Sequence, residues 1–314
     1  MQPLVSICSL TYNHAPYIRQ CLDGFLMQKT NFAFEVLIND DCSTDGTTEI
    51  LKEYAERYPD ILIPVYHEEN LYSKGMRGFY GRFLYPRARG KYIALCEGDD
   101  YWTDPLKLQK QVDFLEANPE YSMCFHSANV FCQSSGQYND LFAYVQDREY
   151  EGVEFIKKWT VPTASVCFRR NVIDSELYQT VRKNPYFVYG DLILFLSCAS
   201  LGRIRGLSSM MSVYRRLDNG AVLSAKSPEM EVRLCRQVLA YAECFGEKYT
   251  KVCRDIFFER SSMFYLASLF KRHSKANKRL LKQALDVSFH RTIVSLFKAF
   301  FVHLKLQVGK AISR

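Results

Sequence analysis

The segment KYIALCEGDDYW, residues 91–102, is the strongest indication of the fold class of this chain. It starts with an apolar run typical of a buried strand, and the acidic residues Glu97, Asp99 and Asp100 follow at once. The next residues, TDP at 103–105, open a helix. A strand-to-helix turn of this kind lies in the crevice where open α/β sheets bind ligands. Its carboxylates are the hard oxygen ligands that suit Mg²⁺ or Mn²⁺, ions that commonly bridge to phosphate oxygens.

A second acidic turn, NDDCSTDG at residues 39–46, follows a strand expected at Phe34–Asn39. A single acidic pair is equally compatible with a solvated turn, but two such turns at strand ends favour a ligand site. Further strands are expected at Leu4–Leu10, Ile61–Tyr66 and Tyr121–Phe131, with helices between them. This alternation predicts a mainly parallel, doubly wound α/β sheet.

Beyond residue 133 the alternation becomes less regular. We expect a strand at Val161–Arg170, an apolar helix at Leu192–Leu201 and two short strands at Gly202–Leu207 and Met210–Arg215. From Pro228 onward the pattern is helical. The first strand is followed by neither GxGxxG nor a Walker-type loop, so a dinucleotide-binding or P-loop reading loses its main support.

Composition limits the class of protein. The 314 residues are 48% hydrophobic, which excludes global disorder. The eleven cysteines form no CxxC pair, and we expect small buried thiols in a reducing compartment rather than disulfides or a zinc site: Cys8, Cys96, Cys124, Cys167 and Cys198 among them. The first residues do not read as a signal peptide, and no apolar run reaches the ~18 residues of a membrane span. A cytoplasmic protein is expected.

Three segments carry a family resemblance: PLVSICSLTYN at 3–13, EVLINDDCSTDGT at 35–47 and ARGKYIALCEGDD at 88–100. In this order and spacing they resemble family 2 glycosyltransferases, in particular bacterial enzymes that build surface polysaccharides. The resemblance covers residues 3–225 and implies the GT-A fold, a Rossmann-like mixed α/β sheet flanked by helices.

The same resemblance implies a domain organisation and an activity. A GT-A domain would occupy residues 1–225, with a nucleotide-binding half at about 1–132 and an acceptor half at about 133–225. A helical C-terminal extension would follow at 226–314. The implied reaction is inverting transfer of a sugar from a nucleotide-sugar to an acceptor hydroxyl, assisted by Mg²⁺ or Mn²⁺, which stabilises the charge of the leaving diphosphate.

For the nucleotide, the resemblance assigns the base and ribose to the end of the first strand, at Thr11, Tyr12 and Asn13. Asp40 would accept a hydrogen bond from the imide of uracil, with Asp41 beside it; thymine offers the same imide, and guanine also has an N–H donor edge. The alternative reading is that both aspartates, with Ser43, cap the following helix.

For the metal, Asp99 and Asp100 match the family motif, with Asp100 as the direct ligand and Asp99 facing the ribose or the metal's water shell. Glu97 would orient this turn. Inversion needs a base opposite the leaving group to take the acceptor proton. Asp191, before the apolar helix, matches the family base, although its position also suits a helix N-cap.

One departure from the family is the segment YRRLDNG at 214–220, where a Tyr-Arg-x-His pattern is usual. Leu217 stands in place of the histidine and cannot ligate a metal. Either Asp218 replaces it, Arg215 or Arg216 neutralises the diphosphate, or metal dependence is weaker. Arg215 matches the family arginine.

Several other residues have two readings each. Trp102 either stacks on a sugar ring or packs in the core. The cations Lys74, Arg77 and Arg82 either approach phosphate or form a solvated face. His14 either touches the nucleotide or is structural.

The C-terminal residues 271–314 hold eleven Lys or Arg and one acid, a net charge of +10 against +7 for the whole chain. Apolar residues recur there at helical spacing: Ile293, Leu296, Phe297, Phe300, Phe301, Leu304 and Val308. Such a basic amphipathic helix either lies on an anionic membrane or packs on this domain or a second subunit. We expect peripheral contact with the inner face of the plasma membrane, close to a polyprenyl-linked acceptor.

Two other classes of function remain open. A sugar nucleotidyltransferase would carry a glycine- and lysine-rich phosphate loop after the first strand, and residues 11–16 contain no such loop. A catalytically silent nucleotide-sugar or glycan-binding protein of the same fold is conceivable because of Leu217. Nucleic-acid binding is disfavoured, since the region before the tail carries no basic excess.

Overall fold

The computed structural model describes residues 2–218, 228–269, 281–282, 284–296 and 298–300. The chain divides into two compact units. The first comprises Met1–Arg182 and Gly190–Asp218, and the second comprises Lys183–Tyr189 and Asn219–Arg314. The domain boundary expected at 225/226 falls outside the described residues.

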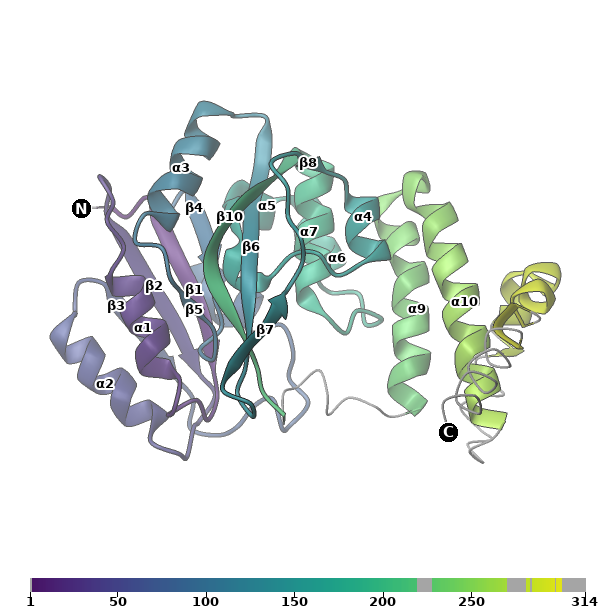
Figure 1. The fold of residues 1–314 in the computed structure, drawn as a ribbon, viewed down its shortest axis with the longest axis horizontal. Coiled ribbons are helices and arrows are strands. Elements are labelled where there is room, and N and C mark those ends of the chain that lie inside the picture. Colours follow the sequence, from purple (N-terminus) through teal and green to yellow (C-terminus); the bar gives the residue numbers. More distant parts are fainter. Residues whose placement is uncertain (1, 219–227, 270–280, 283, 297, 301–314) are drawn as a thin grey trace. The chain divides into compact units, whose positions relative to one another are not determined.

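A mixed ten-stranded sheet forms the centre of the first unit (Figure 1). Its main path runs β3-β2-β1-β4-β9-β6-β10-β5, with β7 paired to β6 and β8 paired to β10. The strands are β1 Val5–Thr11, β2 Phe34–Asp40, β3 Leu62–Tyr66, β4 Tyr92–Leu95, β5 Tyr101–Trp102, β6 Tyr121–Cys132, β7 Gln137–Leu141, β8 Glu149–Tyr150, β9 Cys167–Arg169 and β10 Arg203–Arg216. The expected mixed α/β class is confirmed.

Parallel pairing is confined to two parts of the sheet. Strands β3, β2, β1 and β4 are parallel to one another, and β6 is parallel to β10. Strand β9 joins these parts in antiparallel fashion to both β4 and β6. The expectation of a mainly parallel sheet therefore describes only the N-terminal half. There the strands are apolar runs because both faces of a parallel sheet are covered.

Helices cover the sheet of the first unit (Figure 1). They are α1 Ile18–Leu26, α2 Thr47–Arg57, α3 Lys107–Ala117, α4 Gly152–Lys157, α5 Asn171–Asp174, α6 Glu176–Val181 and α7 Gly190–Leu201, with a π-helical turn η1 at Tyr80–Leu84 and 3-10 turns at Tyr85–Arg87 (η2) and Thr163–Ser165 (η3). Apolar residues of α1, α2 and α3 belong to one core cluster that also includes Val5 and Ile7 of β1. The expected buried thiols at 8, 96, 124, 167 and 198 are all fully buried and free.

Two strand expectations beyond residue 133 are wrong. The two short strands expected at 202–215 are one strand, β10, which bends where its register on β6 shifts between Leu207 and Met210. The strand expected at Val161–Arg170 is a 3-10 turn followed by the three residues of β9. Both differences arise where polar residues or short pairing interrupt the alternation that sequence patterns rely on.

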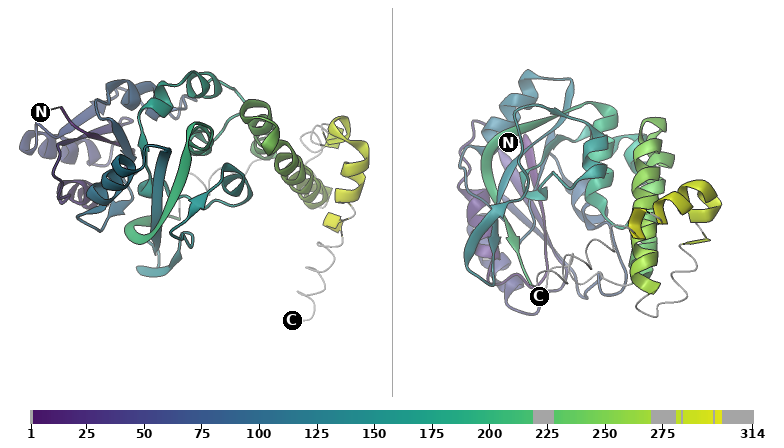
Figure 2. Two further views of the ribbon diagram at one scale, coloured as in Figure 1. Left: turned by 90° about the horizontal axis from the view of Figure 1, so that it is seen from above. Right: turned by 45° about the vertical axis from the view of Figure 1, so that its right-hand side comes forward.

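The second unit is helical. Helix α9, Pro228–Phe245, and helix α10, Thr250–Leu269, run side by side and are joined by the 3-10 turn η4, Glu247–Tyr249 (Figure 2). Residues 284–287 and 289–296 are also helical. Most of the expected amphipathic tail, including Phe297 and residues 301–314, lies outside the described residues. None of the helices that the structure describes combines the length and apolarity needed to cross a membrane.

Candidate active site

The parallel strands bring the two acidic turns to one edge of the sheet. Thr11, the last residue of β1, pairs with Asp40, the last residue of β2. Strand β4 runs parallel on the other side of β1, and the turn after it is fixed there because the Gly98 N–H donates to the Leu10 carbonyl at 2.9 Å. The sequence-predicted residues of both turns therefore meet at the carboxyl edge, where open α/β sheets bind ligands.

The two aspartates of the turn after β4, Asp99 and Asp100, have different surroundings. Asp100 is 3% exposed, and its Oδ1 accepts the Arg215 backbone N–H at 2.8 Å. Burial, with the charge of Asp99, raises the pKa of Asp100 well above its ordinary value. The side chain of Asp99 is 21% exposed, and its Oδ2 lies 4.0 Å from His14 Nε2. Asp99 is therefore the more accessible carboxylate of the pair.

Arg215, expected to face phosphate, is instead occupied within the protein. It is 6% exposed, and its guanidinium donates to the Asp99 carbonyl at 2.8 Å and to Gln20 and Gln133 at 2.6 Å each. The same group lies over three aromatic rings, those of Tyr17, Tyr101 and Phe131. Its side chain and backbone together hold the acidic turn, and direct contact of Arg215 with the substrate stays a prediction.

Two more carboxyl groups contribute to the charge here, that of Glu97 within the turn after β4 and that of Asp191 on α7. Burial, then the charges of Asp99 and Asp191, raise the pKa of Glu97 to about 8. Asp191 lies in the first turn of α7 rather than at its N-cap, and Asp191 Oδ2 accepts from Thr163 Oγ1 at 3.2 Å. Burial raises the pKa of Asp191, and the bond from Thr163 opposes that rise. A raised carboxyl pKa suits a general base, since it increases proton affinity.

The acidic turn after β2, at residues 39–46, is built largely by its own side chains. Asp40, 1% exposed, accepts from the Ser43 N–H and hydroxyl and from the Thr48 hydroxyl. Asp41, 4% exposed, accepts the backbone N–H groups of Leu71 and Tyr72, both at 2.9 Å. Asp40 thus has turn-forming contacts, as in the alternative interpretation, and Asp41 anchors the loop after β3. The nucleotide-binding role of both aspartates stays a prediction.

The residues that end β1 surround Gly98. A Cβ on Gly98 would lie 2.7 Å from Thr11 Oγ1 and 3.0 Å from His14 Nδ1. Both of these buried atoms find no hydrogen-bond partner among the described residues. Tyr12 is 43% exposed, and Asn13 has a positive φ of 54° and accepts the Thr44 N–H through Oδ1. Polar atoms and an exposed aromatic ring thus meet at the acidic turn.

Trp102 does not face this edge. It is 2% exposed, its indole N–H donates to the Ala164 carbonyl at 2.8 Å, and its ring packs edge-on against Phe25. The Lys107 ammonium lies 3.9 Å from the ring centroid. The stacking role is therefore wrong and the core-packing reading is right, because β5 turns this side chain into the interior.

The cations expected near phosphate have local partners. Lys74 pairs with Glu69, and Arg77 donates to the Tyr72 and Met76 carbonyls and lies over the Tyr72 ring. These contacts fit the alternative in which Lys74, Arg77 and Arg82 form a solvated face of the protein.

Three further residues lie near the acidic turn: sequence patterns indicated His14 and Glu97 weakly and did not indicate Tyr80. His14 and Glu97 both face Asp99, and their positions just after β1 and β4 were the signal that favoured them. Tyr80 of η1 gave no sequence signal. Its buried hydroxyl has no partner among the described residues, and burial with the charges of Glu97 and Asp191 raises its pKa. Such π-helical turns are frequent at functional sites.

Comparison with known proteins identifies the family of this chain. The model of the family described as glycosyl transferase family 2 matches residues 6–177. A protein of Mycobacterium tuberculosis with no assigned function is 39% identical over 223 residues, which are 70% of this chain and 61% of that relative. The chain thus matches less than two thirds of that relative's length. The Escherichia coli UDP-Glc:alpha-D-GlcNAc-diphosphoundecaprenol beta-1,3-glucosyltransferase WfaP is 26% identical over 72% of this chain and 82% of that enzyme.

Solved structures give the same fold. Residues 1–349 of Staphylococcus aureus TarS in complex with UDP-GlcNAc have a TM-score of 0.67 at 17% identity, over 93% of this chain and 83% of that one. The mannosyltransferase PcManGT from Pyrobaculum calidifontis, with GDP-Man and Mn²⁺, has a TM-score of 0.53 at 17% identity, over 98% and 87%. The expected GT-A fold is confirmed, and with the family match over more than half of its length, this chain belongs to glycosyl transferase family 2.

Proposed function

We propose that this protein catalyses metal-dependent, inverting transfer of a sugar from a nucleotide-sugar, most simply a UDP-sugar, to a hydroxyl of a saccharide acceptor in surface polysaccharide synthesis. The observation that carries the proposal is the meeting of the acidic turn at Glu97–Asp100 with the ends of β1 and β2, with Asp191 close enough to Glu97 to raise its pKa. Family membership supports the reaction class.

The donor set fits a hard divalent cation. The described residues contain no cluster of three or more His, Cys, Asp or Glu that would hold a metal alone. Mg²⁺ in particular is commonly held by one or two carboxylates together with substrate phosphates, so a site of this kind needs no third side chain. Asp99 and Asp100 would hold the cation, and the greater exposure of Asp99 favours it for direct contact. Bound there, the cation supplies positive charge that stabilises the departing diphosphate.

The remaining chemistry belongs to residues of the chain. Thr11, Tyr12 and Asn13 bind the base and ribose, and Asp40 orients the loop on which a uracil-like base rests. Asp191, ionised, takes the proton of the acceptor hydroxyl as that oxygen attacks the anomeric carbon, and the bond from the donor diphosphate breaks on the opposite face. Thr163 orients the Asp191 carboxylate for this step. Arg215 holds the acidic turn in place.

We extend the proposal to the acceptor and its location. WfaP acts on a sugar linked to diphosphoundecaprenol, and this relative supports a lipid-linked saccharide as acceptor here. Residues 271–314 carry a net charge of +10, which would hold the protein at the anionic inner face of the plasma membrane.

The test is a panel of UDP-, dTDP- and GDP-sugars with Mn²⁺, Mg²⁺ or EDTA, in which both binding and hydrolysis are measured. We expect one donor to bind with metal and to lose affinity in EDTA and in Asp99→Ala. Asp191→Asn should bind that donor normally and lose about 10²–10⁴-fold in transfer rate, the usual contribution of a general base. If no nucleotide-sugar binds with either metal, the proposal fails, and a glycan-binding protein of this fold becomes the better explanation.

A further inference from the structure

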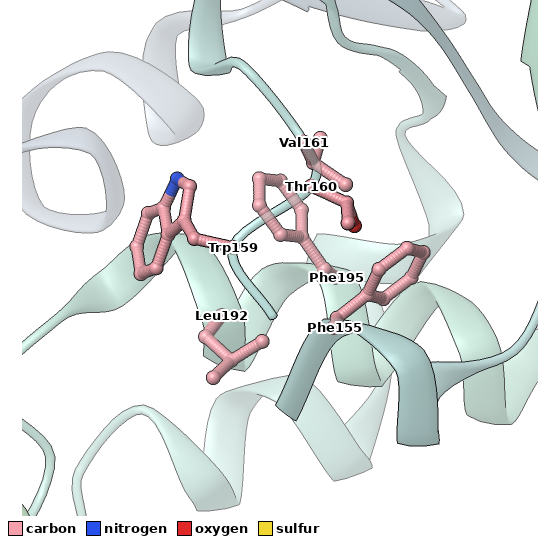
Figure 3. A pocket seen from close by; sticks show the side chains of 6 residues that line it. All are labelled: Phe155, Trp159, Thr160, Val161, Leu192 and Phe195. Carbon is pink, nitrogen blue, oxygen red and sulfur yellow. The ribbon is translucent and has the colours of Figure 1, made fainter. Parts of the chain in front are cut away.

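The pocket beside α7 is too small to bind part of a substrate. Its walls are the side chains of Phe155, Trp159, Thr160, Val161, Leu192 and Phe195 (Figure 3). The space between them holds about one water molecule, and no polar surface faces it. Polar atoms without partners lie instead at the acidic turn after β4, where His14 of the loop after β1 meets Asp99.

The backbone of His14 is fixed from two directions. Its N–H donates to Thr47 Oγ1 at 2.8 Å, and its carbonyl accepts the Tyr17 N–H at 2.8 Å. The N–H of the next residue, Ala15, donates to the Asp45 carboxylate at 2.9 Å. Because the main chain is held on both sides, the imidazole is presented to the acidic turn from a rigid position, which a binding residue needs.

The Nδ1 atom of His14 faces the inside of the protein. It is buried and has no hydrogen-bond partner among the described residues, and the same is true of Thr11 Oγ1. Both atoms lie within 3.0 Å of one point, the position that a Cβ on Gly98 would take. A small rotation of the ring would let the Nδ1–H donate to the Thr11 hydroxyl. Metal-binding histidines almost always donate their second ring N–H to an oxygen in this way.

The other nitrogen, His14 Nε2, faces Asp99 Oδ2 across a gap of 4.0 Å. The two side chains are 19% and 21% exposed, so solvent reaches the pair. The gap is too wide for a direct hydrogen bond, which spans about 2.7–3.2 Å. It fits two ligands of one ion, because atoms that each lie about 2.1 Å from the same metal are at most about 4.2 Å apart. One cation therefore reaches both atoms without movement of the backbone.

We propose that His14 is a ligand of the divalent cation and binds it through Nε2, beside Asp99. The inference rests on the proposed function and adds a residue to its metal site. The nitrogen ligand comes from the loop after β1 and not from residues 214–220, where Leu217 cannot provide one. Mg²⁺ prefers oxygen ligands throughout, whereas transition ions accept imidazole, so His14 favours Mn²⁺ over Mg²⁺.

Electron spin echo envelope modulation of bound Mn²⁺ shows directly whether an imidazole nitrogen is a ligand. The samples are the full chain with Mn²⁺ alone and with Mn²⁺ and UDP. We expect nitrogen modulation in wild type and in the matched control His290→Gln, which removes an exposed histidine of the second unit. The modulation should be lost in His14→Gln and in His14→Ala. Bound Mn²⁺ without nitrogen modulation in wild type would overturn the assignment, and this result needs no variant to fold.

The affinity for Mn²⁺ gives a second readout, measured by the disappearance of the signal of free Mn²⁺ on protein addition. His14→Ala should bind Mn²⁺ about 10-fold or more weakly than wild type, since loss of an outer-shell partner alone costs about 10–100-fold. His14→Gln offers an oxygen in place of the nitrogen, and competition with Mg²⁺ should show that it has lost the preference for Mn²⁺. A His14→Ala protein that is folded by circular dichroism and binds Mn²⁺ like wild type would contradict the proposal.

Nucleotide binding in the same samples separates this inference from the proposed function. If a nucleotide-sugar binds with Mn²⁺ but the ion has oxygen ligands only, the assignment of His14 is overturned and the proposed function stands. If the nitrogen modulation depends on His14 but no nucleotide-sugar binds, the metal site stands and the proposed function fails. If His14→Ala weakens UDP binding equally with Mn²⁺ and in EDTA, the imidazole contacts the nucleotide instead of the ion, and the assignment is overturned.

Discussion

The charge state of Asp191 links its environment to activity. Burial raises its pKa above the ordinary carboxyl value, and the general base that we propose must be ionised, so we expect activity to be lost as pH falls through that raised pKa. The Thr163 hydroxyl stabilises the ionised form. Thr163→Val should therefore raise the pKa further and move the acid limb of kcat/KM against pH to higher pH. Thr163→Ser keeps the hydroxyl and should keep the wild-type limb, and an unmoved limb in Thr163→Val would refute the coupling.

Arg215 is the residue whose removal should cost the most stability. Its guanidinium has three side-chain or carbonyl acceptors and three aromatic neighbours, and it lies beside buried Asp100. Arg215→Met should lower the free energy of unfolding by about 3–5 kcal/mol, as expected when one partner of a buried charged network is lost. Urea denaturation measures this. Arg19→Met, which removes a half-exposed pair with Glu53, should cost under about 1 kcal/mol.

Residue type and position predicted which carboxylates meet at the sheet edge, but not the surroundings of Trp102 and Arg215. The carboxylates of both turns were identifiable because they follow apolar strands, whose ends meet at one sheet edge. The burial of Trp102 and the internal contacts of Arg215 were not, since their partners Ala164, Gln20 and Gln133 are distant in sequence. A pattern shows that a side chain is aromatic or cationic, whereas tertiary packing decides whether it meets solvent.

At the scale of elements, the acidic turn depends on the absence of a side chain at Gly98. Its missing Cβ would lie 2.7–2.8 Å from Thr11 atoms, closer than carbon atoms tolerate. Gly98→Ala should shift the turn away from β1, weaken metal-dependent donor binding and destabilise the fold by about 1–3 kcal/mol, the usual cost of overpacking. Isothermal titration with donor and metal, together with urea unfolding, tests both effects.

Gly190→Ala is the control for that variant in the unfolding measurement. It opens α7, and a Cβ there would meet nothing within 4 Å. A Gly98→Ala protein as stable as wild type, with unchanged donor affinity, would mean that the turn does not need close contact with β1.

Long, buried strands could be predicted from the sequence, whereas short strands could not. Strands β1, β2 and β4 were located within a residue or so, because fully covered parallel strands read as continuous apolar runs. Strands β5 and β8, two residues each, carry no periodicity to detect. Strand β10 was divided in two because Ser208 and Ser209 interrupt its apolar pattern at the register shift.

At the scale of the whole molecule, charge is concentrated in the C-terminal residues. With +10 in residues 271–314 and −3 in the remainder, binding to anionic vesicles should be strong at low salt and weaken as ionic strength rises. Cosedimentation with phosphatidylglycerol vesicles, against phosphatidylcholine vesicles, measures this. Replacing Lys271, Arg272, Lys275 and Lys278 by Gln should reduce the binding, whereas salt-independent binding to both vesicle types would contradict an electrostatic contact.

The convergence of contacts on Arg215 has a consequence for how the protein is made. Its partners come from α1, from the turn after β4 and from the loop after β6, all of which leave the ribosome well before residue 215 does. The acidic turn therefore lacks its contacts with Arg215 through most of synthesis. A nascent chain ending near residue 132 already contains every proposed nucleotide and metal ligand, but not the strand that holds the turn in place. Competence to bind donor should appear only after the last strand of the sheet has emerged.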